Sequence, residues 1–207
     1  MKNSPAIAYW LGANPSLYLN ITNRCSNDCY FCFRNFAKGV GGFNLRLQKE
    51  PSVEEVTKEL QRFINLKPWR EVVFCGFGEP LERLDCLLGV ARWVKKYHGT
   101  PVRVDTNGHG YLLNPGREVI RELKGAGVDR VSVSLNAHDE KTYNRVCRPK
   151  FEGAYENVLR FIQEASKELD TEVTAVDIPE MDLPKVEEMA RKMGARFRRR
   201  EYLPPSR

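Results

Sequence analysis

The chain has 207 residues, 42% of them hydrophobic and 29% charged, a composition typical of one globular domain rather than of a disordered chain. No apolar run approaches the roughly 20 residues of a membrane-spanning helix, and the first residues lack a signal peptide's apolar stretch, so we expect a cytoplasmic protein without a membrane partner. The net charge of +6 is compatible with an anionic substrate or a nucleic acid but identifies neither.

Six short β-like segments alternate with helical ones along the chain. Strands are predicted at residues 16–22, 71–76, 102–107, 131–136, 172–178 and 195–202. Helices are predicted from a cap at Ser52, with Glu55 three residues on, and at about 84–94, 117–124, 155–169 and 183–193.

This alternation predicts an α/β fold with a parallel sheet and right-handed crossovers. A closed eight-unit barrel takes about 250 residues. The chain is therefore expected to form an open, partial (β/α)6 TIM-like barrel, and a flat doubly wound sheet is the alternative.

Polar residues alternate with valine or leucine in two of the predicted strands. They are Arg103, Asp105 and Asn107 in one strand, and Ser132, Ser134 and Asn136 in the other. Helices should cover the apolar faces, which places the polar faces inside the curve of the sheet. Buried Asp, Asn and Ser are costly unless hydrogen-bonded, which favours a polar ligand there. A solvated sheet face is the alternative.

Three cysteines follow the first predicted strand with the spacing C-x3-C-x2-C, at Cys25, Cys29 and Cys32. Thiolates are the usual ligands of iron–sulfur clusters. Three thiolates on a four-iron cluster leave one iron open to a further ligand, as the open position of a catalytic zinc does. Alternatives are a zinc site completed by Cys75 or Cys147, a purely electron-transferring cluster, or a chance structural grouping.

The cysteine spacing after the first strand resembles the signature of the radical S-adenosylmethionine (radical SAM) superfamily, and the resemblance covers nearly the whole chain. It implies a single core domain over residues 1–207, with a cluster loop at about 23–44 and no auxiliary-cluster domain. It also implies two cofactors, a 4Fe-4S cluster bound by the three cysteines and S-adenosylmethionine.

Further segments resemble the cofactor contacts of that superfamily. Residues 75–80 (CGFGEP) are similar to its Gly-Gly-Glu segment, which meets the amino group of the cofactor's methionine part. The resemblance implies cofactor-binding roles for Phe31 near the adenine, Gly76, Gly78 and Glu79 at the methionine end, Ser134 and Asn136 at the ribose, and Asp105 and Asn107 in the same cavity. Arg148 is predicted to bind the cofactor's carboxylate, with a surface salt bridge as the alternative.

More narrowly, the segments LNITNRCSNDCYFC, EVVFCGFGEPLERLD, VDTNGHG, VSVSLNA and VCRPK together resemble the TatD-associated radical SAM proteins. The implied activity is reductive cleavage of S-adenosylmethionine to a 5′-deoxyadenosyl radical, which abstracts hydrogen from an unidentified substrate. The alternatives are an activase that installs a radical on a partner protein, and a non-catalytic redox or nucleic-acid-binding module. Expected partners are an electron donor such as flavodoxin or ferredoxin, and a TatD-like protein or macromolecular substrate at the open barrel edge.

Three further features bear on the substrate side, and two of them have two interpretations each. Arg196, Arg198 and Arg200 alternate in the last strand, where they either face the cavity and suit an anion or protect a solvated edge. His109 is a candidate on the substrate side, near the mouth of the cavity. Cys147 is either a buried structural thiol or a relay.

Overall fold

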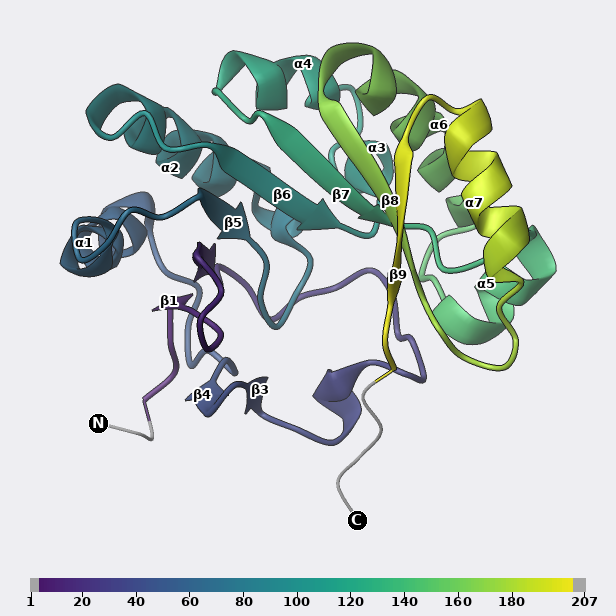
Figure 1. Cartoon of the computed structure of the whole chain (residues 1–207), viewed down its shortest axis with the longest axis horizontal. Coiled ribbons are helices and arrows are strands. Elements are labelled where there is room, and N and C mark those ends of the chain that lie inside the picture. Colours follow the sequence, from purple (N-terminus) through teal and green to yellow (C-terminus); the bar gives the residue numbers. More distant parts are fainter. Residues whose placement is uncertain (1–3, 203–207) are drawn as a thin grey trace.

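The computed structural model describes residues 4–202, which form a curved sheet with helices along one face (Figure 1). The sheet has seven strands in the order β1-β2-β5-β6-β7-β8-β9. Their bounds are Ala8–Tyr9, Ser16–Leu19, Glu71–Phe74, Val102–Thr106, Arg130–Ser134, Asp170–Val176 and Arg196–Arg200. All neighbouring pairs are parallel except β1 with β2.

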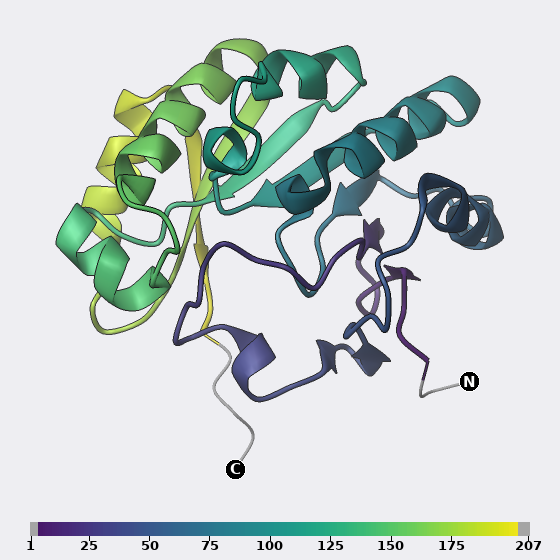
Figure 2. The ribbon, with the colours of Figure 1, turned by 180° about the vertical axis from the view of Figure 1, so that it is seen from behind.

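The sheet does not close into a barrel within the described residues, because β1 and β9 are its two ends and do not pair with each other. Seen from behind, the helices lie together in front of the sheet (Figure 2). The predicted open, partial barrel is therefore confirmed. A doubly wound sheet would need helices on both faces.

The helices are α1 (Val53–Ile64), α2 (Leu84–Tyr97), α3 (Gly110–Leu113), α4 (Val119–Gly125), α5 (Glu140–Cys147), α6 (Ala154–Glu168) and α7 (Leu183–Lys192). Two 3-10 turns, η1 (Phe33–Asn35) and η2 (Pro80–Arg83), and a small hairpin of β3 (Gly39–Val40) with β4 (Phe43–Asn44) complete the elements. No helix among residues 4–202 has the length and apolar character needed to cross a membrane.

The start of α1 confirms the predicted capping box. The Ser52 hydroxyl accepts a hydrogen bond from the Glu55 amide at 3.2 Å, and the Glu55 carboxylate accepts one from the Ser52 amide at 2.8 Å. This exchange satisfies two of the amides that a helix start leaves unpaired. The short elements α3, α5, β1 and the β3–β4 hairpin were not predicted from the sequence.

The main core lies between the sheet and the helices. Val102 and Val104 of β6 and Val131 and Val133 of β7 are fully buried there. Their polar neighbours along the strands point to the other face, as the alternation predicts. The inner face carries only a small apolar cluster, at β2 and β5.

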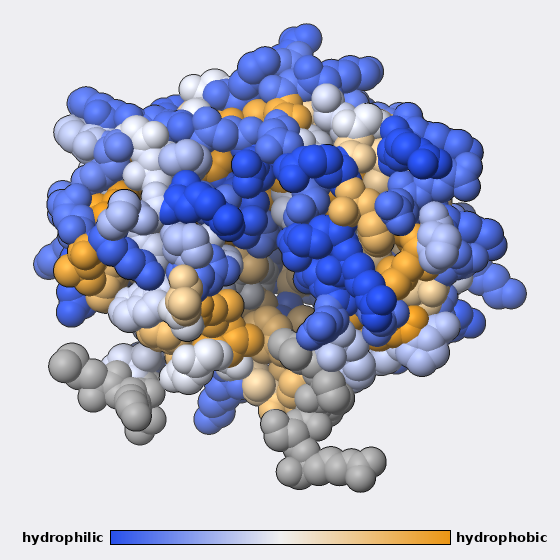
Figure 3. Space-filling model, viewed as in Figure 1, coloured by the Kyte–Doolittle hydropathy of each residue, from blue (hydrophilic) through white to orange (hydrophobic). Residues whose placement is uncertain are grey.

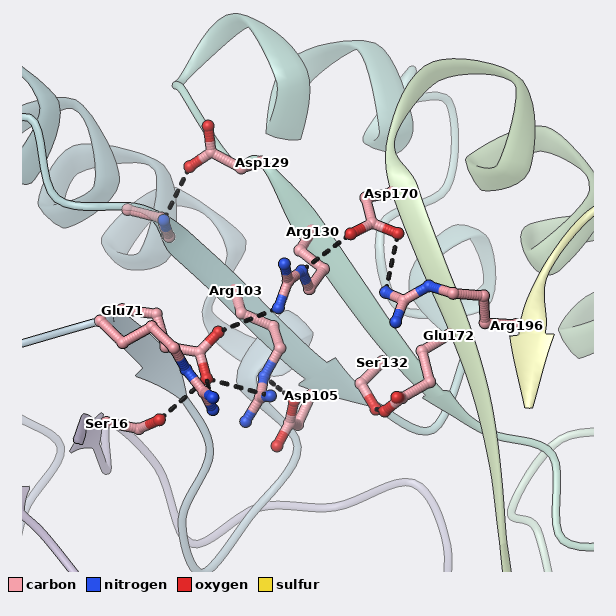
Figure 4. A network of polar contacts seen from close by, with 12 residues as sticks. Ser16, Glu71, Arg103, Asp105, Asp129, Arg130, Ser132, Asp170, Glu172 and Arg196 are labelled. Atoms are coloured by element: carbon pink, nitrogen blue, oxygen red, sulfur yellow. Dashed lines mark hydrogen bonds and ion pairs between the residues drawn. The ribbon is translucent and has the colours of Figure 1, made fainter. Parts of the chain in front are cut away.

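Charged side chains on the inner face form ion pairs near the amino ends of the strands (Figure 4). Glu71, 3% exposed, accepts a hydrogen bond from the Ser16 hydroxyl at 2.8 Å and lies 3.2 Å from Arg103. Arg130 lies 2.9 Å from Asp170. Because the protein itself neutralises these charges, the polarity at this end of the sheet needs no ligand.

Candidate functional site

A cavity of about 280 Å³ opens at the carboxyl ends of the strands. Figure 3 shows the surface hollowed at its centre, with hydrophilic side chains over β9 on one side and apolar ones below. The three cysteines line this cavity together with eight of the nine predicted cofactor positions, Phe31, Gly76, Gly78, Glu79, Asp105, Asn107, Ser134 and Asn136. The ninth, Arg148, does not.

The cysteine loop lies between this cavity and a second pocket of about 420 Å³, which the three cysteines also line. Arg34, Lys38 and Arg46 surround this outer pocket, and Lys38 and Arg46 are exposed. The loop therefore separates an inner cavity of mixed polarity from a basic outer surface.

The cysteine thiols are half-buried, and their environment favours the protonated form. Burial, followed by the Glu79 carboxylate, raises the pKa of Cys25 to about 12. Burial also raises the pKa of Cys32. The neighbouring Cys147 thiol is the first cause that raises the pKa of Cys29, and burial is the second. Binding of a metal centre must therefore displace protons from these thiols.

A buried chain of hydrogen bonds holds the cysteine loop from behind. The Asn107 side-chain amide donates to the Ser26 hydroxyl at 2.8 Å, and Ser26 is joined to His109 Nδ1 at 2.8 Å. His109 Nε2 is in turn joined to the Tyr143 hydroxyl at 2.8 Å, which also accepts from Asn27 Nδ2 at 3.2 Å. Ser26 and Asn27 directly follow Cys25. The segment after β6, with Asn107 and His109, and helix α5 therefore together fix the position of the cysteine loop.

The backbone adds to this anchor at the end of α5. The amide of Asp28 donates to the Cys147 carbonyl at 3.0 Å, and that of Tyr30 donates to the Val146 carbonyl at 3.2 Å. Cys147 is fully buried in the main core and does not line the cavity. These contacts favour the structural interpretation of Cys147.

Two of the sequence predictions were wrong in their placement. His109 is fully buried behind the cysteine loop rather than near the cavity mouth, and burial lowers its pKa to about 4, which keeps the ring neutral at pH 7. Arg148 is exposed and forms the left-handed cap of α5 at φ +46°. It lines a separate surface pocket with Glu140 and Asn144, so it does not reach the cavity.

Glu79 joins the segment after β5 to the end of β6. One of its carboxylate oxygens accepts from the Thr106 hydroxyl at 2.7 Å and the Leu81 amide at 3.1 Å, and the other accepts from the Asn107 amide at 2.7 Å. Burial raises its pKa to about 7 although these three donors favour the charged form. Glu79 therefore orders the carboxyl ends of two strands, whatever else it binds.

The raised pKa of Glu79 predicts a pH-dependent contribution to stability. A folded pKa above the unfolded value means that the protonated carboxyl stabilises the fold at low pH, and that this contribution is lost as pH rises from about 4.5 to about 7. In the cluster-free state, the wild type should unfold with a larger free energy than Glu79→Gln at pH 5. We expect this difference in the free energy of unfolding to fall by about 3 kcal/mol between pH 5 and pH 8. Urea unfolding at both pH values measures this, and an advantage that grows with pH would contradict it.

Gly76 and Gly78 lie where another part of the chain leaves no room for a side chain. A Cβ on Gly76 would lie 2.3 Å from Asn20 Oδ1, and one on Gly78 would lie 2.3 Å from the Arg24 carbonyl oxygen. The Glu79 amide also donates to this carbonyl, at 2.7 Å. The two glycines therefore allow the segment after β5 to lie against the start of the cysteine loop.

We predict that Gly78→Ala destabilises the protein by about 1–3 kcal/mol, because the backbone of one of the two segments must shift. Gly125 in α4 is the matched control, since a Cβ there meets nothing within 4 Å. Gly125→Ala should be neutral or stabilising. Urea unfolding of both variants measures the difference, and equal stabilities would mean that the approach at Gly78 is not tight.

Ser134 is the last residue of β7 and Asn136 follows two residues later, and both line the cavity. The Asn136 side-chain oxygen accepts from the Val176 amide at 3.1 Å, and its backbone is left-handed at φ +52°. Of the three alternating arginines of β9, Arg198 and Arg200 line the cavity and Arg196 does not. The predicted position at the cavity is therefore confirmed for Arg198 and Arg200, whereas Arg196 is exposed and pairs with Asp170.

Comparison with known proteins places the chain in a family. The family model described as "Radical SAM superfamily" matches residues 19–193. A probable GTP 3′,8-cyclase of Methanococcus maripaludis is 28% identical over 190 residues, which are 91% of this chain and 59% of that protein. One from Methanocaldococcus jannaschii is 28% identical over 196 residues, with the same coverage. The chain thus spans less than two thirds of these relatives.

Solved structures share the fold. Streptococcus suis SuiB bound to S-adenosylmethionine superposes with a TM-score of 0.70 at 14% identity, over 92% of this chain and 41% of SuiB. Methylornithine synthase (PylB) gives a TM-score of 0.62 at 15% identity, over 91% of this chain and 53% of PylB. Since the family model covers most of the described residues, the chain belongs to the radical SAM superfamily of enzymes.

Proposed function

We propose that this protein cleaves S-adenosylmethionine reductively at a site-differentiated 4Fe-4S cluster and uses the resulting 5′-deoxyadenosyl radical to abstract hydrogen from a substrate. Superfamily membership implies both cofactors. The observation that carries the proposal is the convergence of Cys25, Cys29 and Cys32 with eight predicted cofactor positions on one cavity.

The residues present fit such a cluster. The three thiols need not converge on one point, because each cysteine of a four-iron cluster binds a different iron. Within residues 4–202, no three His, Cys, Asp or Glu side chains converge on a position for a single metal ion. The glycines at 76 and 78 let the segment after β5 lie against the start of the cysteine loop, so that Glu79 follows directly beside this loop. When bound, the reduced cluster supplies the electron that breaks the sulfonium bond of S-adenosylmethionine.

The protein's own contribution is placement. We assign Cys25, Cys29 and Cys32 to the cluster, and residues 76–79 to the methionine end of S-adenosylmethionine. The Glu79 carboxylate already accepts three hydrogen bonds from the protein, so an ammonium group would find it positioned in advance. Ser134 and Asn136 would contact the ribose, and Phe31, 8% exposed, the adenine.

The relatives' names suggest one candidate substrate, GTP. The chain spans 59% of the length of two of these relatives. GTP is therefore a compound to test as the substrate of this protein. We further propose that residues 1–207 act as one radical SAM core and that the chain belongs with the TatD-associated subgroup. The motifs around the cysteines and strand ends support this subgroup. A TatD-like protein or a macromolecular substrate would then cover the sheet edge at β9.

The electron donor is proposed to approach from the outer pocket. Arg34, Lys38 and Arg46 surround this pocket, and the cysteines form part of its wall. An acidic donor such as flavodoxin or ferredoxin would be attracted by this surface.

The proposed function is tested by anaerobic incubation of the cluster-reconstituted protein with dithionite and S-adenosylmethionine. We expect 5′-deoxyadenosine and methionine to form in equal amounts, slowly without substrate. A protein that carries a full cluster and forms no 5′-deoxyadenosine would exclude the proposed chemistry and favour a non-catalytic redox module.

A further inference from the structure

Strand β9 carries four arginines, and three of them have a carboxylate partner. Arg196 lies 2.8 Å from Asp170, Arg198 lies 2.8 Å from Glu172, and Arg199 pairs with Asp177. Arg200 forms no ion pair with any carboxylate of residues 4–202. It is therefore the arginine of this strand that has no direct carboxylate contact among the described residues.

The guanidinium of Arg200 is half-buried and poorly hydrogen-bonded. Its Nη2 lies 3.3 Å from the Ser134 hydroxyl and 3.4 Å from Asn136 Oδ1, both near the limit of a hydrogen bond. Its Nε is enclosed and has no partner within the described structure. An arginine keeps its charge in proteins, and a partly buried charge without a partner is costly. A ligand that supplies the missing acceptors would offset this cost.

The position of Arg200 places this charge beside the cysteine loop. Arg200 lines the cavity, and its charge acts to lower the pKa of both Cys29 and Cys32. Burial lowers the pKa of Arg200, whereas the negative charge of the Asp105 carboxylate raises it. An anion bound at Arg200 would therefore lie next to the site where the cofactor is expected.

The other charges on the cavity wall are largely compensated. Arg198 pairs with Glu172, and Asp105 lies 2.9 Å from Arg103. Burial raises the pKa of Asp105. The remaining charged residues of the wall are Glu79, whose carboxylate accepts three hydrogen bonds, Arg34, which stacks over Phe77, and the exposed Glu201. Arg34 likewise has no carboxylate partner, but Arg200 is the wall cation with an enclosed nitrogen that has no hydrogen-bond partner among the described residues.

We propose that Arg200 binds a carboxylate or phosphate group of a ligand in this cavity. The planar guanidinium fork matches the two oxygens of such a group. On the function proposed above, the group has two possible sources, the methionine carboxylate of S-adenosylmethionine and an anionic group of the substrate. The two sources are separated by experiment.

The test measures equilibrium binding to the cluster-loaded protein without reductant. The probes are radiolabelled S-adenosylmethionine, followed by dialysis, and pyrophosphate and succinate, followed by calorimetry. Arg200→Gln is compared with Arg199→Gln, a neighbour that pairs with Asp177 and does not line the cavity. We expect Arg200→Gln to weaken at least one probe by about tenfold or more, and Arg199→Gln to change each by less than about twofold.

Weaker binding of S-adenosylmethionine alone assigns the anion to the cofactor, and weaker binding of pyrophosphate or succinate assigns it to the substrate. An Arg200→Gln protein that carries the full cluster and binds all three probes as the wild type does would overturn the proposal. If that variant loses its cluster, Arg200→Lys replaces it. This variant keeps the charge without the fork, so a weakening of about three- to tenfold is expected and an unchanged affinity is contradictory. The binding test needs no turnover. Its result can therefore be interpreted even if the protein forms no 5′-deoxyadenosine.

Discussion

Replacing Cys25, Cys29 or Cys32 by alanine is expected to remove the bound cluster and all formation of 5′-deoxyadenosine. In the proposed cluster each thiolate binds a different iron, and the loop has three cysteines. The wild type should bind about four irons and four sulfides per chain after anaerobic reconstitution, and each variant close to none. Iron and acid-labile sulfide analysis, with the visible absorption of the cluster, measures this.

Cys86→Ala is the matched control for these variants. Cys86 belongs to the first turn of α2 and is 4% exposed, and its thiol lies 3.9 Å from the Pro51 carbonyl. Removing the thiol should leave a small cavity that lowers the stability by about 1 kcal/mol. The iron content should remain unchanged. A triple cysteine variant that still carries one intact cluster per chain would show that the ligands lie elsewhere.

Removing the Tyr143 hydroxyl is expected to loosen the cysteine loop without touching a cofactor ligand. Tyr143 is fully buried, and its hydroxyl joins His109 at 2.8 Å and Asn27 at 3.2 Å. Tyr143→Phe leaves both partners buried without this bond, at a cost of about 1–3 kcal/mol. That cost corresponds to a roughly 5- to 150-fold increase in the equilibrium constant for opening of the cysteine loop.

We therefore expect Tyr143→Phe to release its iron to a chelator about tenfold faster than the wild type. Tyr155→Phe is the control, because the ring of Tyr155 packs against that of Tyr143. Within residues 4–202 the Tyr155 hydroxyl has one hydrogen-bond partner, the Met189 sulfur at 3.9 Å. The control should release iron at the wild-type rate. Equal release from all three proteins would mean that the hydrogen-bond chain does not hold the loop.

The elements that the sequence predicted well are those with strong local signals. The capping box at Ser52 and Glu55 requires only residues three apart, and it is present. The predicted first strand ran to residue 22, whereas β2 ends at Leu19. The difference arises because Asn20 is buried by contacts from distant segments, donating to the Leu45 carbonyl at 2.7 Å and accepting from the Phe77 amide at 2.9 Å.

The error at Arg148 has its origin in the unrecognised helix α5. Its signals were present, since Asp139 caps it by accepting from the Thr142 amide at 2.8 Å, and Tyr143, Val146 and Cys147 follow at helical spacing. Recognising α5 would have placed residue 148 at its end rather than in the cavity. The chain of bonds from His109 to Ser26 joins residues 83 apart in sequence, so local patterns could not reveal it.

The central claim is that Cys25, Cys29 and Cys32 hold a four-iron cluster with one iron open to S-adenosylmethionine. Electron paramagnetic resonance of the dithionite-reduced protein, recorded before and after addition of S-adenosylmethionine, tests it most directly. We predict a four-iron signal whose shape and position change on addition, because the ligand binds the open iron. A signal that saturating S-adenosylmethionine leaves unchanged would contradict the claim, and so would a reconstituted protein without any four-iron signal.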